Sequence, residues 1–382
     1  MRIVDTGILN QSEPGTARAT LTCPSVVPLS DGTLLGTSRA GSTKDGADET
    51  VEFYRSLDQG ATWSAPWQPF KPPRVRGLRG SLKCCYLTEL APGRLLAAAI
   101  WVDRETYPGQ GIFHPDTEGC LPLKILLAES GDLGNTWSPF QEVPMPEELG
   151  PPSLTNPILL LPDGTLAMSV ESNKNYHDSS TWNQRVVVFH STDSGQSWGP
   201  PVVAGFDPSG RIFNWDQRLA VAPDGRIAAF AWTYDTKTRK FLNIHRRIST
   251  DGGRDWSPAE DLGITDQASH PAMLPDGRVV LTWVDRFGTA TIRARVAPAI
   301  DAPFAPESEV VLYRHPASAG DTRDADGALG LSLWSFGLPY AEVLPDGDVL
   351  VVYYAGNEST MDIHWSRIHP DPGEHSEEGR LS

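Results

Sequence analysis

The sequence predicts an all-β protein built as a six-bladed β-propeller. Three observations support this prediction: the pattern S-x-D-x-G-x-x-W occurs four times, a glycine-ended hairpin turn occurs six times, and turn-forming residues are abundant. The chain has 35 Gly and 33 Pro in 382 residues, so its apolar runs are short and frequently interrupted. Such a composition is typical of many short strands joined by tight turns.

The hairpin turns set the period of the chain. Each turn lies between two apolar, β-rich runs, as in AMLPDGRVVLTWVD, and the six turns end at Gly32, Gly93, Gly164, Gly225, Gly277 and Gly347. In the Pro-Asp-Gly version, Pro presets φ, Asp tolerates the turn and Gly adopts a positive φ. The turns are roughly 50 to 70 residues apart, which is the period of a large propeller blade with loop insertions.

In four units a third apolar run leads directly into the S-x-D-x-G-x-x-W pattern, as in STDSGQSW at 191–198. The four runs are 51–56, 123–130, 185–191 and 242–249. A further run follows the turn, so each unit is expected to form a four-stranded antiparallel blade. The side chains expected to bond backbone N–H groups of their own turns are Asp58, Asp132, Asp193 and Asp251.

The last two units deviate from this pattern. In the fifth, Phe304 stands where the Trp is expected and the Asp is lost, and the sixth ends one strand short. We expect the N-terminal run 2–9 to supply the missing strand, because closing the ring removes open sheet edges. No change in composition marks a linker. Residues 1–370 are therefore predicted to form one propeller domain, and residues 371–382 a polar C-terminal tail.

Charge and composition restrict the classes of partner. The net charge of −16 argues against nucleic-acid binding, because phosphate neutralisation needs basic surface. No apolar run is long enough to span a membrane, and residues 1–15 have no signal-peptide core. We expect no membrane partner and a cytoplasmic location, or a secreted or periplasmic one if a signal has been removed. The oligomeric state is left open.

The cysteines do not predict a disulfide framework or a zinc site. Cys84 and Cys85 are adjacent, Cys23 and Cys120 stand apart, and no C-x-x-C pair occurs. Free buried thiols are therefore expected. No cofactor and no metal is predicted.

The S-x-D-x-G-x-x-W pattern resembles the Asp-box, or bacterial neuraminidase repeat, of the sialidase superfamily. Four copies in phase with six hairpin turns extend the resemblance over nearly the whole chain. It implies a sialidase-like propeller whose Asp-box turns lie on the face opposite the active site. It also implies a carbohydrate substrate, a Tyr nucleophile with a Glu beside it, an Asp acid–base, and three arginines that hold the substrate carboxylate.

Two carboxylates match positions of that family. Asp216, in DQRLAVAPDG, takes the place of the family's Glu, and Arg218 lies near it as a substrate-binding residue or as a salt-bridge partner. Asp45, in SRAGSTKDGADE, fits the acid–base Asp by its spacing to the first Asp-box, with Arg39 and Asp48 in the same segment. We expect a general acid at Asp45 to be kept partly protonated by burial or by a neighbouring carboxylate.

Other family positions carry different residues. Thr22 and Trp232 stand where two of the arginines are expected, and Arg286 is the candidate for the third. Leu338 occupies the position of the nucleophilic Tyr, and Tyr340, two residues on and on the same strand face, is the candidate nucleophile. Because Thr or Trp cannot replace a bidentate Arg, ordinary sialidase activity is not expected. Trp232 remains a candidate substrate-binding residue.

Two further segments carry candidate residues. His270 begins a first strand and would act as a base, including in lyase chemistry on uronic acids. The segment ESNKNYHD resembles a sugar-hydroxyl-binding loop, through Glu171, Asn173 and Tyr176.

The segment 71–83 forms a basic run in an otherwise acidic chain. It is expected to meet a uronic acid or another anionic sugar, or to pair with the protein's own acids. Its basic residues are Lys71, Arg74, Arg76, Arg79 and Lys83.

The leading functional prediction is a sialidase-like glycoside hydrolase that removes a terminal sugar, neutral or anionic, from an oligosaccharide or glycoconjugate. Asp45 and Asp216 would be the catalytic carboxylates, with Tyr340 or a water molecule as the nucleophile. One alternative is a uronate-directed polysaccharide lyase with His270 or a Tyr as base. Another is a carbohydrate-binding propeller without catalysis.

Overall fold

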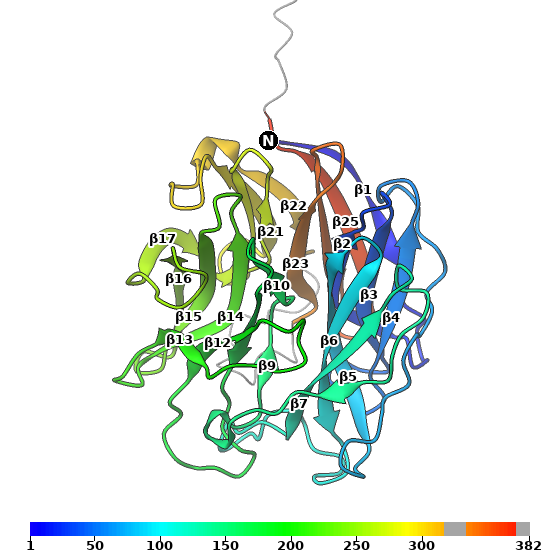
Figure 1. Ribbon diagram of the computed structural model, residues 1–382, viewed down its shortest axis with the longest axis vertical. Helices are drawn as coiled ribbons and strands as arrows, with labels where there is room; N and C mark the ends of the chain where they lie inside the picture. The colour runs from blue at the N-terminus through cyan, green and yellow to red at the C-terminus, as the bar shows by residue number, and fades with distance from the viewer. Residues whose placement is uncertain (317–333, 372–382) are drawn as a thin grey trace, which may run out of the picture.

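The protein is an all-β propeller, and its computed structural model describes residues 1–316 and 334–371 (Figure 1). The first blade contains β2 (Thr20–Pro28), β3 (Leu34–Gly41) and β4 (Thr50–Ser56). The second contains β5 (Gly80–Ala91), β6 (Arg94–Asp103), β7 (Leu123–Ser130) and β8 (Gln141–Glu142). The third contains β9 (Ser153–Leu154), β10 (Leu159–Leu160), β11 (Leu166–Glu171), β12 (Arg185–Ser191) and β13 (Val202–Phe206).

The remaining strands form three more blades. The fourth contains β14 (Ile212–Val221), β15 (Ile227–Asp235), β16 (Lys240–Ser249) and β17 (Glu260–Thr265). The fifth contains β18 (Gln267–Ala268), β19 (Ala272–Met273), β20 (Val279–Asp285), β21 (Thr291–Ala297) and β22 (Val310–Arg314). The sixth contains β23 (Phe336–Val343), β24 (Val349–Gly356), β25 (Met361–His369) and β1 (Arg2–Asn10).

The N-terminal strand closes the ring, as the sequence predicts. β1 pairs antiparallel with β25 from Arg2 opposite His369 to Asn10 opposite Ile363, and the two lie side by side in Figure 1. One parallel pairing, Thr20 with Met361, then joins the sixth blade to the first in a seven-stranded sheet. The predicted polar tail lies outside the described residues beyond Asp371.

The innermost strand of each blade is interrupted at a corresponding position. A register shift occurs in β2, β5, β14 and β23. In β14 it lies between Trp215 and Arg218, and in β23 between Gly337 and Tyr340. The inner strand is split in two other blades, into β9 and β10 in the third and into β18 and β19 in the fifth. Such bulges redirect side chains out of the regular alternation of a strand and are enriched near active sites.

The four Asp-box turns share one hydrogen-bonding pattern. In the first, the Ser56 hydroxyl accepts the N–H of Gly60 at 2.8 Å and donates to Asp58 at 2.8 Å, and Asp58 accepts the N–H of Thr62 at 2.8 Å. The corresponding bonds recur around Ser130, Ser191 and Ser249. These carboxylates are therefore occupied in holding the turns.

Ser56→Ala is expected to destabilise the protein by about 1–3 kcal/mol, because it leaves the buried N–H of Gly60 without an acceptor. Urea unfolding would measure the change, with Leu57→Ala as the control, since Leu57 is 78% exposed. Equal stabilities of the two variants would contradict this role for the turn.

No helix in the described residues is long and apolar enough to cross a membrane; those present include the 3₁₀ segments Glu147–Leu149 and Pro306–Ser308.

Candidate active site

Strand pairing places the site and the Asp-box turns at opposite ends of the blades. In the first blade Leu34 lies opposite Ser56 at the Asp-box end, whereas Ala40 lies opposite Thr50 at the other end. The same order holds for β6 with β7, β11 with β12 and β15 with β16. The segment that carries Asp45 joins β3 to β4 at the end remote from the Asp-box.

A cavity of about 180 Å³ lies at this second end. The interrupted inner strands line it with Cys23, Lys83, Asp216 and Leu338. Three of these have a positive φ, namely 51° at Cys23, 52° at Asp216 and 46° at Leu338. The bulges thus turn these side chains toward the cavity. Seven of the twelve predicted site residues line it: Arg39, Asp45, Glu171, Asn173, Asp216, Arg218 and Trp232.

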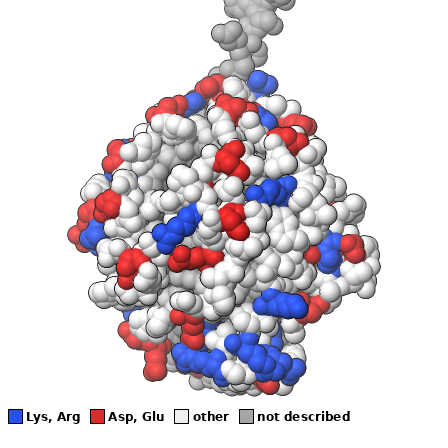
Figure 2. Space-filling view, turned by 45° about the vertical axis from the view of Figure 1, so that its right-hand side comes forward, with Lys and Arg blue, Asp and Glu red and all other residues white. Residues whose placement is uncertain are grey.

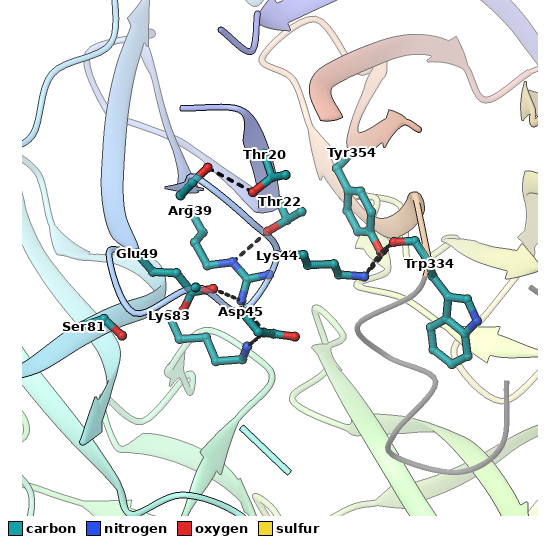
Figure 3. Close-up of polar contacts among 12 residues, drawn as sticks. Thr20, Thr22, Arg39, Lys44, Asp45, Glu49, Ser81, Lys83, Trp334 and Tyr354 are labelled. Carbon is teal, nitrogen blue, oxygen red and sulfur yellow. Dashed lines mark hydrogen bonds and ion pairs between the residues drawn. The ribbon is translucent and has the colours of Figure 1, made fainter. Parts of the chain in front are cut away.

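Asp45 lies at the centre of a cluster of cations (Figure 3). Its carboxylate forms ion pairs with Lys83 and, at 3.1 Å, with the Arg39 guanidinium. Burial alone would raise the pKa of Asp45, but the charges of Lys83, Arg39 and Lys44 outweigh it and hold that pKa well below its usual range. Asp45 is thus held ionised, which differs from the partly protonated acid that the sequence led us to expect.

Arg39 supplies a guanidinium beside the position where the family resemblance led us to expect one. Thr22 stands at that position in β2, and Arg39 is its cross-strand partner in β3. The Arg39 Nε–H donates to the Thr22 hydroxyl at 2.7 Å, and its Nη1 lies 3.0 Å from Glu49. A guanidinium therefore reaches the cavity from the neighbouring strand, but two carboxylates of the protein already neutralise it.

Glu171 and Asp216 form a second, differently poised pair of carboxyls. Glu171 ends β11, and its Oε1 accepts the N–H of Gln217 at 2.9 Å, beside Asp216. Burial and then the charge of Asp216 raise the pKa of Glu171 to about 8. Asp216 accepts hydrogen bonds from Arg218 at 2.8 Å and from Gln267 at 2.7 Å. The cavity therefore holds a neutral carboxyl next to an ion-paired carboxylate.

Aromatic side chains line the cavity on the side of the third to sixth blades. Four of them are tryptophans: Trp182, Trp215, Trp232 and Trp334. The ring centroids of Trp182 and Trp215 are 5.9 Å apart, and those of Trp232 and Trp334 are 5.3 Å apart. Lys44 lies across from them and donates to the Trp334 carbonyl at 2.7 Å (Figure 3). Indole faces beside polar groups suit a sugar ring, which has apolar faces and polar edges.

Tyr340 and His270 are not among the lining residues. Their rings stack on each other at 4.1 Å, and both are at least 94% buried. Burial, followed by the charge of Arg218, lowers the pKa of His270 to about 3, and burial raises the pKa of Tyr340 well above its usual value. The His270 Nδ1 lies 3.0 Å from Asn156. The two residues are packed in the core, which corrects their predicted positions facing a substrate.

Three other predicted residues also lie outside the lining. Tyr176 stacks on Tyr107 at 4.8 Å, and Asp48 accepts the backbone N–H of Ser42 at 3.1 Å. Arg286 lies against the Trp334 ring, 4.1 Å from its centroid, and donates to Gln267 at 2.8 Å. Arg286 thus supports the aromatic wall.

Several lining residues, which come from the bulges and from distant loops, were not predicted from the sequence. Cys23 and Leu338 each precede a Pro, as do Asn156 and His270 at the breaks in the third and fifth inner strands. A Pro inside a strand pattern indicates an edge or a bulge, so this recurring Pro was the available signal. Lys44 and Trp334 carried no such signal, because residues 290 positions apart meet only in the folded chain.

All four cysteines are free, and three of them, Cys23, Cys84 and Cys120, line the cavity. Cys23 is partly exposed, whereas the other three are buried, so the prediction of buried thiols holds for three. Across residues 1–316 and 334–371 no group of three or more His, Cys, Asp or Glu side chains is placed to hold a metal ion.

The six blades and the cavity at their centre define a sialidase-like β-propeller. Its structure is similar to a protein of unknown function from Dyadobacter fermentans, with a TM-score of 0.72 and 20% identity over 96% of this chain and 99% of that one. It is also similar to the intramolecular trans-sialidase of Ruminococcus gnavus, with a TM-score of 0.62 and 15% identity over 94% of this chain and 97% of that one. For the α-L-arabinanase of Penicillium chrysogenum the TM-score is 0.63 and the identity 16%, over 97% of this chain and 99% of that one. By sequence, the chain matches no known family and no curated protein.

Proposed function

We propose that the protein is a glycoside hydrolase that removes a terminal sugar from a glycan bound in this cavity. The observation that carries the proposal is the pair of neighbouring carboxyls Glu171 and Asp216: Glu171 has a raised pKa, and Asp216 is held by an ion pair with Arg218 and a hydrogen bond from Gln267. An enzyme that keeps one carboxyl protonated and a second one ionised has a general acid and a general base at the same pH. Similar propellers support the substrate class, since one is complexed with arabinobiose and another with 2,7-anhydro-Neu5Ac.

In the proposed reaction Glu171 is the general acid. Its carboxyl, neutral below about pH 8, gives its proton to the glycosidic oxygen as the bond from that oxygen to the anomeric carbon breaks. Asp216 takes a proton from the attacking water, whose oxygen joins the anomeric carbon. Arg218 and Gln267 hold the Asp216 carboxylate in place for this step.

Asp45 takes a different part from the one expected of it. Because Lys83 and Arg39 keep it ionised, its charge would stabilise the positive charge that develops on the sugar ring in the transition state. The indole rings of Trp215 and Trp232 would support the ring. Nothing in the placement of His270 favours the uronate lyase, since that residue packs against Tyr340.

The experiment is a turnover screen with aryl glycosides and uronate-containing oligosaccharides. We expect release of the aryl group or reducing sugar without absorbance from an unsaturated product. Asp216→Asn should lower kcat at least about 100-fold on any substrate found. Absorbance from unsaturated product would favour a lyase, and binding without turnover would favour a carbohydrate-binding propeller; either result would overturn the proposal.

A further inference from the structure

A basic hairpin stands at the rim of the cavity face. Residues 71–79 precede β5, whose first residue, Gly80, pairs with Asp103 at the end of β6 remote from the Asp-box. Val75 and Leu78 exchange backbone hydrogen bonds of 3.1 and 3.0 Å, and the Trp101 indole donates to the Pro73 carbonyl at 2.9 Å. The hairpin is therefore an ordered element that presents its charged side chains outward.

Those side chains are exposed and incompletely neutralised. The exposed fractions are 60% for Arg74, 69% for Arg76 and 70% for Arg79. Arg76 and Lys124 contact Glu142, at 2.9 and 3.4 Å, whereas Arg74 and Arg79 both approach Glu105, at 3.7 and 3.6 Å. Four cations thus share two carboxylates, an excess of two positive charges, and the exposed Lys71 adds a third to the same segment of a chain of net charge −16.

The hairpin is connected to the cations of the cavity. The Arg79 carbonyl accepts the N–H of Arg104, and the Arg104 side chain contacts Glu49, the partner of Arg39, at 3.1 Å. Lys83 lies on β5, four residues after Arg79, which at the rise of a strand places the two residues about 13 Å apart along the chain. Figure 2 shows Lys and Arg side chains gathered at the lower end of a surface that elsewhere carries mixed charges.

We propose that the 71–79 hairpin is a second binding surface, which holds the anionic part of an oligosaccharide whose terminal sugar occupies the cavity. This inference rests on the proposed function and adds a substrate class to it: glycans that carry carboxylate or sulfate groups on several residues. Guanidinium groups pair with either anion in bidentate fashion. The surrounding negative charge of the protein disfavours long polyanions that must lie across more of its surface.

The test compares two triple variants of the full chain in a Glu171→Gln background, which is expected to slow turnover by at least about 100-fold. One is Arg74→Gln/Arg76→Gln/Arg79→Gln, and its control is Arg94→Gln/Arg226→Gln/Arg278→Gln, which removes the same charge beside the hairpin turns of the opposite face. Calorimetry would measure binding of an oligogalacturonate hexasaccharide, a heparin hexasaccharide and neutral maltohexaose. Thermal unfolding would verify that both variants are folded.

We expect the hairpin variant to bind one or both anionic hexasaccharides about tenfold more weakly, with a flatter salt dependence, and the control to change less than twofold. A carboxylate preference would appear with the oligogalacturonate and a sulfate preference with the heparin fragment. Equal effects of the two variants, no effect, or equally tight binding of a single-stranded oligonucleotide would overturn the proposal. Because binding is read without turnover, failure of the hydrolase proposal would show separately in the screen.

Discussion

Glu171→Gln is expected to lower kcat by about 10²- to 10⁴-fold on the substrate that the screen identifies, because Gln keeps the shape of the carboxyl and has no proton to give. Turnover by the unchanged protein should fall as pH rises through about 8, where Glu171 loses its proton. The pH dependence of kcat would measure this. The control is Glu148→Gln, since Glu148 is exposed and does not line the cavity.

Glu171→Gln is also expected to change how the free energy of unfolding depends on pH. Glu171 has a folded-state pKa of about 8 against an ordinary value of 4.5, so the folded protein binds the proton more tightly. The contribution of Glu171 to stability should therefore be lost as pH rises from about 4.5 to 8. Because Glu342 also has a raised pKa, of about 8, Glu171→Gln should show a smaller loss over this range than the native protein rather than none. A variant that is inactive and also less stable at pH 8 would indicate a structural role for Glu171.

Asp45→Asn is expected to lower the free energy of unfolding by about 3 kcal/mol, because it leaves Lys83 and Arg39 as incompletely paired charges in a mostly buried site. Lys83→Met in the same chain should recover at least about 1 kcal/mol, since it removes one unpaired cation. Urea unfolding of the two single variants and the double variant would measure the coupling. Additive losses would mean that the two side chains do not stabilise each other.

The acid dependence of this effect follows from the lowered pKa of Asp45. Its ordinary value is 3.8, and in the folded protein it lies well below that. The stabilisation by Asp45 is present above pH 3.8 and is lost as pH falls toward the folded-state value. The stability difference between the native protein and Asp45→Asn should therefore be constant between about pH 5 and 6, below the lowered pKa of Lys44 of about 7, and shrink in stronger acid.

The propeller could be predicted from the sequence because its signals are local. Each Asp-box turn is held by bonds among residues at most four positions apart, such as Ser56 to Gly60, so the pattern specifies the turn by itself. The hairpin turns fix the order of strands in the same way. The closure by β1 followed from counting strands, since a missing strand at one end and a spare strand at the other can only meet in one blade.

The candidate site could be predicted only in part, because its chemistry depends on contacts between blades. The resemblance indicated Asp216 through its hairpin turn and Asp45 through its spacing to the first Asp-box, and both line the cavity. It could not reveal that Lys83, 38 residues away, pairs with Asp45, or that burial beside Asp216 keeps Glu171 protonated. Tyr340 was assigned by strand parity, but the bulge between Gly337 and Tyr340 breaks that parity and directs Tyr340 to His270 instead.

The central claim, that the Glu171 carboxyl beside the ion-paired Asp216 is neutral at neutral pH, is tested most directly by ¹³C NMR titration of the Glu side chains. Burial also raises the pKa of Glu342 to about 8, so Glu171→Gln and Glu342→Gln would assign the two signals. We predict that the signal lost in Glu171→Gln titrates near pH 8 in the free protein. Titration of that signal near pH 4.5 would contradict the assignment of Glu171 as the general acid.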